Sequence, residues 1–213
     1  MSEYIEIVAE LKGWRVKLYH DDDAFHLDPR KDRDNLGRLI CCHRRYKLGD
    51  VHGFTVDTEG SDGWAELRDL IEDEEPVAVI TPVFMYDHSG LAFRLGGGFS
   101  DVDSAGWDWG QVGWCYVTEA AARDEYGPSW RDRLSELMAL LKSELDEYGA
   151  WCSGEVYGYR VFDPQGEEQD ACWGYIGYQW AQTAARDALT QAVESFEERE
   201  AEVACLMQRG FPL

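Results

Sequence analysis

The chain has 213 residues, of which 42 are acidic and 20 basic, and its net charge is −22. A charge of this size repels nucleic acids and anionic lipids, so we expect no direct nucleic-acid binding and no membrane partner. Apolar residues make up 45% of the chain and aromatic residues 13%, which excludes a disordered acidic tail. The longest uncharged apolar run, residues 76–86, is too short to span a bilayer. The N-terminus does not have the pattern of a secretory signal, so we expect a cytoplasmic protein.

The first sixty residues predict a hairpin and a buried segment. Residues 4–11 and 14–20 have the pattern of two strands joined at Lys12-Gly13. A charged loop follows, and the apolar residues 36–42 are expected to be buried. Residues 61–75 have apolar residues at helical spacing and are expected to form a helix that ends before Pro76.

The rest of the chain alternates between predicted strands and helices. Residues 77–80 and 83–86 predict β-rich runs separated by Thr81-Pro82, and residues 96–111 predict a long loop. Further strands are expected at 91–95, 112–117, 155–162 and 169–175, and further helices at 118–126, 129–148 and 178–208. This pattern predicts a single acidic α+β domain over residues 1–213. Its antiparallel or mixed sheet would pack with several helices, including a long C-terminal helix.

The six cysteines do not have the spacing of a disulfide framework. They contain no CxxC pair, and Cys41 and Cys42 are adjacent. In the expected cytosolic context we predict that all six are unpaired thiols.

Two short segments contain residues that could do chemistry. Asp87-His88-Ser89 offers an acid, a base and a hydroxyl, but catalytic triads are assembled across a fold and not from consecutive residues. In Cys42-His43 a buried thiol beside a surface histidine is the preferred interpretation. The five histidines form no HxH or HExxH pattern. We therefore predict no catalytic residues, no metal and no cofactor.

Basic residues concentrate between positions 30 and 47, where two interpretations compete. With Tyr46 they could form a nucleic-acid patch. Alternatively, they anchor on carboxylates of the acidic body, and the excess of negative charge elsewhere favours this second interpretation. We expect Arg44 and Arg45 to pair with acidic residues.

The acidic surface is the main positive signal. On the last predicted helix, Glu194, Glu198 and Glu202 recur every four residues, which places them about 6 Å apart along the axis. Successive phosphates of one DNA strand lie at a similar separation, roughly 6–7 Å. The candidate partner-binding residues are Glu194, Glu197, Glu198, Glu202, Glu72, Asp73, Glu74, Glu75, Asp101 and Asp103, with Trp107 and Trp109 as apolar anchors.

Several sequence blocks carry a family resemblance. They are DNLG at 34–37, CHRRYKLGD at 42–50, YDHSG at 86–90, WDWGQVG at 107–113, YVT at 116–118, GEVYGY at 154–159 and CWGY at 172–175. In order and spacing they resemble a largely uncharacterised family of bacteriophages and mobile elements, over roughly residues 14–180. The chain departs from that pattern at 95–106, where relatives carry a Ser/Thr-Pro-Phe-Ser-Cys-Pro run. The resemblance implies a host-defence antagonist, and an anti-CRISPR inhibitor of a type I surveillance complex is the specific expectation.

Three functional hypotheses follow. The first is a monomeric inhibitor that imitates the charge of DNA and blocks a basic nucleic-acid-binding host protein. The second is an enzyme of unknown reaction that uses Cys42-His43 and Asp87-His88-Ser89, which requires these side chains to converge in one cleft. The third is a structural or regulatory phage protein whose acidity serves solubility.

Overall fold

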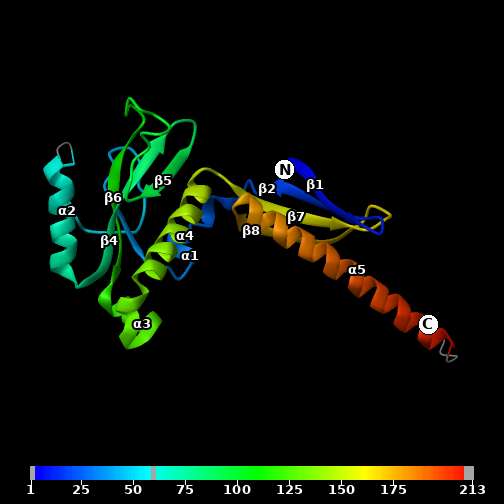
Figure 1. The fold of residues 1–213 in the computed structure, drawn as a ribbon. Helices are drawn as coiled ribbons and strands as arrows, with labels where there is room; N and C mark the ends of the chain where they lie inside the picture. The colour runs from blue at the N-terminus through cyan, green and yellow to red at the C-terminus, as the bar shows by residue number, and fades with distance from the viewer. Residues whose placement is uncertain (1–2, 59–60, 209–213) are drawn as a thin grey trace. The chain divides into compact units, whose positions relative to one another are not determined.

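A computed structural model describes residues 3–58 and 61–208. Contacts divide the chain into two compact units (Figure 1). Unit 1 consists of Met1–His26 and Gly154–Leu213, and unit 2 of Leu27–Ser153. Unit 1 is therefore built from the two ends of the sequence, and unit 2 is inserted between them.

Unit 1 is a four-stranded antiparallel sheet with one long helix against it. Its elements are β1 (Tyr4–Leu11), β2 (Trp14–His20), the short helix η1 (Ala24–His26), β7 (Val156–Phe162), β8 (Glu168–Ile176) and α5 (Tyr178–Gln208). The strand order is β1-β2-β7-β8. Figure 1 shows α5 lying along this sheet and continuing past it.

The alternation of side chains explains how unit 1 folds. Val16 and Leu18 of β2 are fully buried, whereas the intervening Lys17 is half-buried on the other face. Beneath the buried face, α5 contributes Ala185, Leu189 and further small or aliphatic residues. The turn between β1 and β2 has positive φ at Lys12 (51°) and Gly13 (86°), as tight hairpin turns require.

Unit 2 has a second four-stranded antiparallel sheet, in the order β3-β6-β4-β5. Its elements are α1 (Pro29–Asp32), β3 (Arg38–Cys41), α2 (Ser61–Glu74), β4 (Val77–Asp87), β5 (Leu91–Leu95), β6 (Trp109–Thr118), α3 (Glu119–Tyr126), η2 (Gly127–Arg133) and α4 (Leu134–Cys152). Leu39 packs in the cluster that includes α4, and its neighbour Ile40 packs in the cluster that includes α2. The two helices therefore cover opposite faces of this sheet (Figure 1).

The structure differs from the sequence expectation at Pro82. The two β-rich runs form one strand, β4, that continues through this proline. Pairing with β5 begins only at Val83, opposite Leu95. The Pro82 carbonyl still accepts a hydrogen bond from the Gly96 N–H at 2.8 Å, so the missing N–H of Pro82 falls at the very end of the β5 pairing, where a proline interrupts the sheet least.

The end of α5 also differs from expectation. The helix has the predicted bounds, and Ala185, Leu189 and Val193 form its buried apolar stripe. Phe196 and Val203 continue the apolar spacing of this helix, which would predict that they face inward, but they are 38% and 37% exposed. The sheet ends before the helix does, so within residues 3–58 and 61–208 the apolar stripe is only partly covered at Phe196 and beyond.

The expectation of an α+β fold with antiparallel strands and a long C-terminal helix is confirmed. The strands were expected in one sheet, and they form two. All six cysteines are free thiols, as predicted. Within residues 3–58 and 61–208, none of the helices combines the length and apolar character needed to cross a membrane.

Candidate functional site

The exposed end of α5 carries the first group of predicted binding residues. After Val193, every residue from 194 to 208 is exposed. This segment contains five glutamates and one arginine. Among the described residues, no lysine or arginine pairs with Glu194, Glu198 or Glu202, so these carboxylates face water. At a rise of about 1.5 Å per residue, the segment is about 22 Å long.

Glu197, the remaining predicted residue on α5, has a different environment. Its carboxylate forms an ion pair with Lys12 in the β1–β2 turn. Phe196 beside it packs edge-on against Trp14, with ring centroids 5.5 Å apart. These two contacts hold α5 against the sheet where the exposed segment 194–208 begins. Glu197 therefore has a structural role and is not a free carboxylate of the glutamate row.

An apolar groove follows the face of α5 opposite the glutamate row. It has a volume of 510 Å³ and is lined by Phe196, Val203 and Met207, among others. In a helix of about 3.6 residues per turn, Phe196 and Val203 lie roughly opposite Glu194 and Glu198. The exposed segment therefore presents two chemically different faces.

The acidic residues at the end of α2 are less available. Glu72 pairs with Arg68 at 2.9 Å within the helix. Glu75 pairs with Arg38 of β3 at 3.2 Å and accepts a hydrogen bond from the Tyr116 hydroxyl at 3.3 Å. Asp73 and Glu74 are exposed. Within residues 72–75, therefore, only Asp73 and Glu74 are exposed carboxylates that do not take part in these contacts.

The loop between β5 and β6 uses its acidic residues for its own structure. The Asp103 carboxylate accepts hydrogen bonds from four backbone N–H groups, those of residues 105–108. These bonds, first among them that from the Asp108 N–H, hold the pKa of Asp103 below its usual value. Asp101 pairs with Arg94 at 2.6 Å.

The two tryptophans of this loop have different roles. Trp109 donates a hydrogen bond from Nε1 to the Asp103 carbonyl at 2.8 Å, and its ring lies against Gly98. Trp107 is 86% exposed. Trp107 could therefore act as an anchor for a partner, whereas Trp109 holds the loop together.

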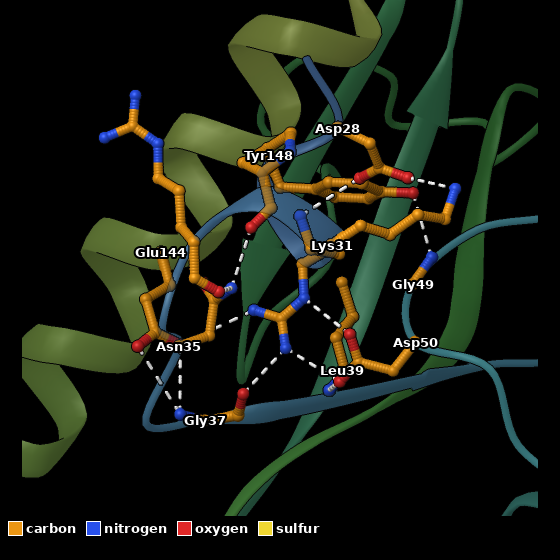
Figure 2. A network of polar contacts seen from close by, with 12 residues as sticks. Asp28, Lys31, Asn35, Gly37, Leu39, Gly49, Asp50, Glu144 and Tyr148 are labelled. Carbon is orange, nitrogen blue, oxygen red and sulfur yellow. Dashed lines mark hydrogen bonds and ion pairs between the residues drawn. The ribbon is translucent and has the colours of Figure 1, made fainter. Parts of the chain in front are cut away.

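A buried polar network holds the basic segment of unit 2, and Figure 2 shows it from close by. The Arg30 side chain, only 4% exposed, donates two hydrogen bonds of 2.7 Å to the Asp50 carboxylate. It also donates one of 2.6 Å to the Gly37 carbonyl and lies 3.5 Å from Glu144 of α4. The Glu144 carboxylate accepts from the N–H groups of Leu36 and Gly37 at 2.7 and 3.1 Å.

The same arrangement settles the interpretation of the basic residues between 30 and 47. Arg33 pairs with Glu147 at 3.1 Å and Arg45 with Asp87 at 2.6 Å, and Arg38 with Glu75 as above. The preferred interpretation, pairing with carboxylates of the body, therefore holds for most of the segment. Arg44 is an exception, because no described residue offers it a carboxylate within 4 Å. The expectation for Arg44 was wrong.

The side chains of the enzyme hypothesis do not meet in one cavity. Cys42 and His43 line a cavity whose lining residues do not include His88 or Ser89. Instead, His88 places Nδ1 2.9 Å from the Asp108 carboxylate, and its side chain is 62% exposed. Burial raises the pKa of Cys42, the opposite of what a thiolate nucleophile requires.

His43, the neighbour of Cys42, has a structural role. Its Nδ1 accepts hydrogen bonds from the N–H groups of Arg45 and Tyr46 at 3.3 and 3.2 Å, and its ring stacks on that of Tyr46 at 5.0 Å. Burial lowers the pKa of His43, and the charge of Arg45 lowers it further. Among the described residues no group of three or more histidines, cysteines or acidic residues could hold a metal ion.

The cavity that Cys42 and His43 line was not predicted from the sequence. It has a volume of 970 Å³ and lies between the irregular residues 42–58, the start of α1 and the end of α4. Its formation depends on contacts such as that of the Gly49 N–H with the Tyr148 hydroxyl, 2.8 Å long and 99 positions apart in sequence. Sequence periodicity contains no signal for contacts of this kind.

Comparisons with known proteins yield no matching family model, no similar curated protein and no similar solved structure.

Proposed function

We propose that this protein is a non-enzymatic antagonist that binds a basic, nucleic-acid-binding host protein in the cytoplasm of the host cell. The observation that carries the proposal is the exposed end of α5, where Glu194, Glu198 and Glu202 face water without a cationic partner among the described residues. A helix held at its base by Trp14 and Lys12 presents these charges in a fixed geometry. Preorganised charge of this kind costs little entropy on binding.

The glutamate row can take the place of phosphates on such a partner. Carboxylates four residues apart on a helix are separated by about 6 Å, close to the phosphate spacing of one DNA strand. A partner that holds DNA carries arginines and lysines at matching intervals, and these would form charge-assisted hydrogen bonds with the carboxylates. The protein would act as a monomer and would not itself bind nucleic acid, because its net charge is −22.

The apolar groove on the opposite face gives this interface a second component. Apolar side chains such as Phe196 and Met207 bind more strongly when a partner removes them from water, and they do not depend on salt. The partner is therefore expected to combine basic residues with an apolar contact. The family resemblance leads us to propose a type I CRISPR surveillance complex as this partner, with blocked DNA binding as the inhibitory step.

A competition assay tests the proposal. The surveillance complex is mixed with its target duplex and increasing amounts of the protein, at two salt concentrations. We expect the protein to displace the duplex, and to do so less well at high salt, because salt screens charges over a Debye length of about 8 Å at physiological strength. Normal DNA binding in the presence of excess protein would contradict the proposal for this target.

Charge-reversal variants locate the surface. Glu194→Lys, Glu198→Lys and Glu202→Lys together should weaken competition strongly, because they place like charges against the partner. The control is Asp124→Lys, Glu125→Lys and Asp132→Lys, three exposed acidic residues of unit 2 whose reversal changes the net charge equally. Equal losses in both variants would assign the effect to overall charge and would remove α5 from the proposal.

A further inference from the structure

The cavity of unit 2 is large enough for a small-molecule ligand and is open to solvent. Its volume of 970 Å³ lies at the upper end of the range of about 300–1,000 Å³ for ligand sites. Its residues come from three parts of unit 2, namely α1, residues 41–58 and the end of α4. The proposed function does not use this cavity.

Two cationic side chains at the cavity take no part in the ion pairs of unit 2 among the described residues. Three carboxylates line the cavity. Asp50 is bound by Arg30, and Asp28 is bound by Lys31 at 2.7 Å and by the Arg30 N–H at 3.0 Å. The third, Asp57, is exposed near the end of residues 42–58. Arg44 and Lys47 also line the cavity and are exposed. Neither has a carboxylate within 4 Å among the described residues. In a chain with a twofold excess of acids, two unpaired cations at one cavity offer a local site for an anion.

Aromatic rings form the other part of the lining. Tyr46, Tyr148 and Trp151 contribute, and the rings of Tyr148 and Trp151 stack at 5.9 Å with an angle of 28° between them. Tyr148 is only 2% exposed, so the half-buried Tyr46 and Trp151 offer most of the aromatic surface. Aromatic rings of this kind stack favourably with the planar bases of nucleotides.

The hydrogen bonds of these rings fix their positions. The Tyr148 hydroxyl accepts from the Gly49 N–H at 2.8 Å, and the Tyr46 hydroxyl donates to Asp87 at 3.1 Å. Because Nδ1 of His43 accepts two backbone N–H groups, its ring proton lies on Nε2, which is then a donor.

We propose that this cavity binds a nucleoside monophosphate, with the base against the aromatic lining and the phosphate on Arg44 and Lys47. A planar ring and an anionic group on one small molecule match the two kinds of lining residue. A monomer also carries only about two negative charges, whereas a polynucleotide would meet the repulsion of the whole protein. The cavity is therefore expected to select a nucleoside monophosphate over a polynucleotide.

Calorimetric titration of the full-length protein with AMP tests the proposal, with adenosine, inorganic phosphate and a short single-stranded oligonucleotide as comparison ligands. We expect AMP to bind more tightly than each of the three. Binding of inorganic phosphate or adenosine as tight as that of AMP would overturn the two-part site. Tighter binding of the oligonucleotide would overturn the selectivity for a monomer, and no binding of AMP at millimolar concentration would overturn the whole proposal.

Paired variants locate the binding. Arg44→Ala with Lys47→Ala should weaken AMP binding at least tenfold and leave the melting temperature of the unbound protein unchanged, because both side chains are exposed. The control, Arg133→Ala with Lys142→Ala, removes the same charge from exposed positions of unit 2 outside the cavity lining. Unchanged AMP affinity in the first variant, or an equal loss in the control, would contradict the assignment.

Discussion

Arg45 donates a hydrogen bond of 2.6 Å to the carboxylate of Asp87, 42 positions away in the sequence. The Tyr46 hydroxyl donates to the same oxygen at 3.1 Å. Asp87 is thus an acceptor that holds the loop after β3 against the end of β4. The contact joins the segment that begins at Cys42-His43 to the segment Asp87-His88-Ser89. The sequence presents these segments as separate candidates for chemistry, and the contact gives them a shared structural role.

Arg45 and Arg30 should differ in their effect on stability. Arg30→Ala leaves Asp50 and Glu144 without their buried cation, which typically costs about 3–5 kcal/mol in the free energy of unfolding. Arg45→Ala removes a pair whose arginine is 61% exposed and should cost less than about 1 kcal/mol. Urea unfolding of both variants measures the difference. A loss of less than about 1 kcal/mol for Arg30→Ala would show that the Arg30 network does not stabilise unit 2.

Gly37 should not tolerate a side chain. A methyl group there would lie 2.1 Å from the Leu141 side chain, so Gly37→Ala should cost about 1–3 kcal/mol through overpacking. Gly97→Ala is the matched control, because nothing lies within 4 Å of a methyl group at that position. Thermal unfolding followed by circular dichroism should show a lower melting temperature for the first variant alone.

A pair of valines on α5 tests where the core of unit 1 ends. Val193 is 2% exposed and Val203 is 37% exposed. Val193→Ala should cost about 2 kcal/mol, since it removes buried methyl groups and leaves a cavity, whereas Val203→Ala should cost clearly less. A larger loss at Val203 in urea unfolding would mean that the end of α5 is covered.

The Asp103 carboxylate should stabilise its loop in a pH-dependent way. Its pKa is lowered from the ordinary value of 3.8 by the four backbone N–H donors. A carboxyl with a lowered pKa in the folded state stabilises the fold above its ordinary pKa, and this effect is lost as the pH falls through the lowered value. The stability difference between the wild type and Asp103→Asn should therefore shrink below about pH 4. A difference that stays constant down to pH 2 would contradict this assignment.

The six thiols should react at very different rates. Cys205 is exposed, whereas Cys41 and Cys115 are buried, and burial raises the pKa of Cys115 to about 12. A disulfide reagent should label Cys205 first in the native protein, and all six thiols only in denaturant without reductant. Fewer than six reactive thiols under those conditions would reveal a disulfide.

The sequence predicted the secondary structure better than the site. Strands such as β1 and β2 and the bounds of α5 follow from apolar periodicity and from turn residues such as Gly13, which are local signals. The continuation of β4 through Pro82 depends on where its neighbour β5 stops, and the exposure of Phe196 depends on where the sheet stops. The cavity of unit 2 depends on contacts between Gly49 and Tyr148, far apart in the sequence. Such long-range relationships have no periodic pattern.

The discontinuity of unit 1 has a consequence for synthesis on the ribosome. The β1–β2 hairpin emerges before unit 2, but β7, its next partner in the sheet, begins only at Val156. All of unit 2, residues 27–153, is made in between. Until then the hydrogen-bonding edge of β2 and the apolar side chains of Val16 and Leu18 lack their native cover. An isolated two-stranded hairpin is marginally stable at best. The order of translation therefore leaves the N-terminal strands dependent on the last third of the chain, and a stalled or truncated chain would present an aggregation-prone edge.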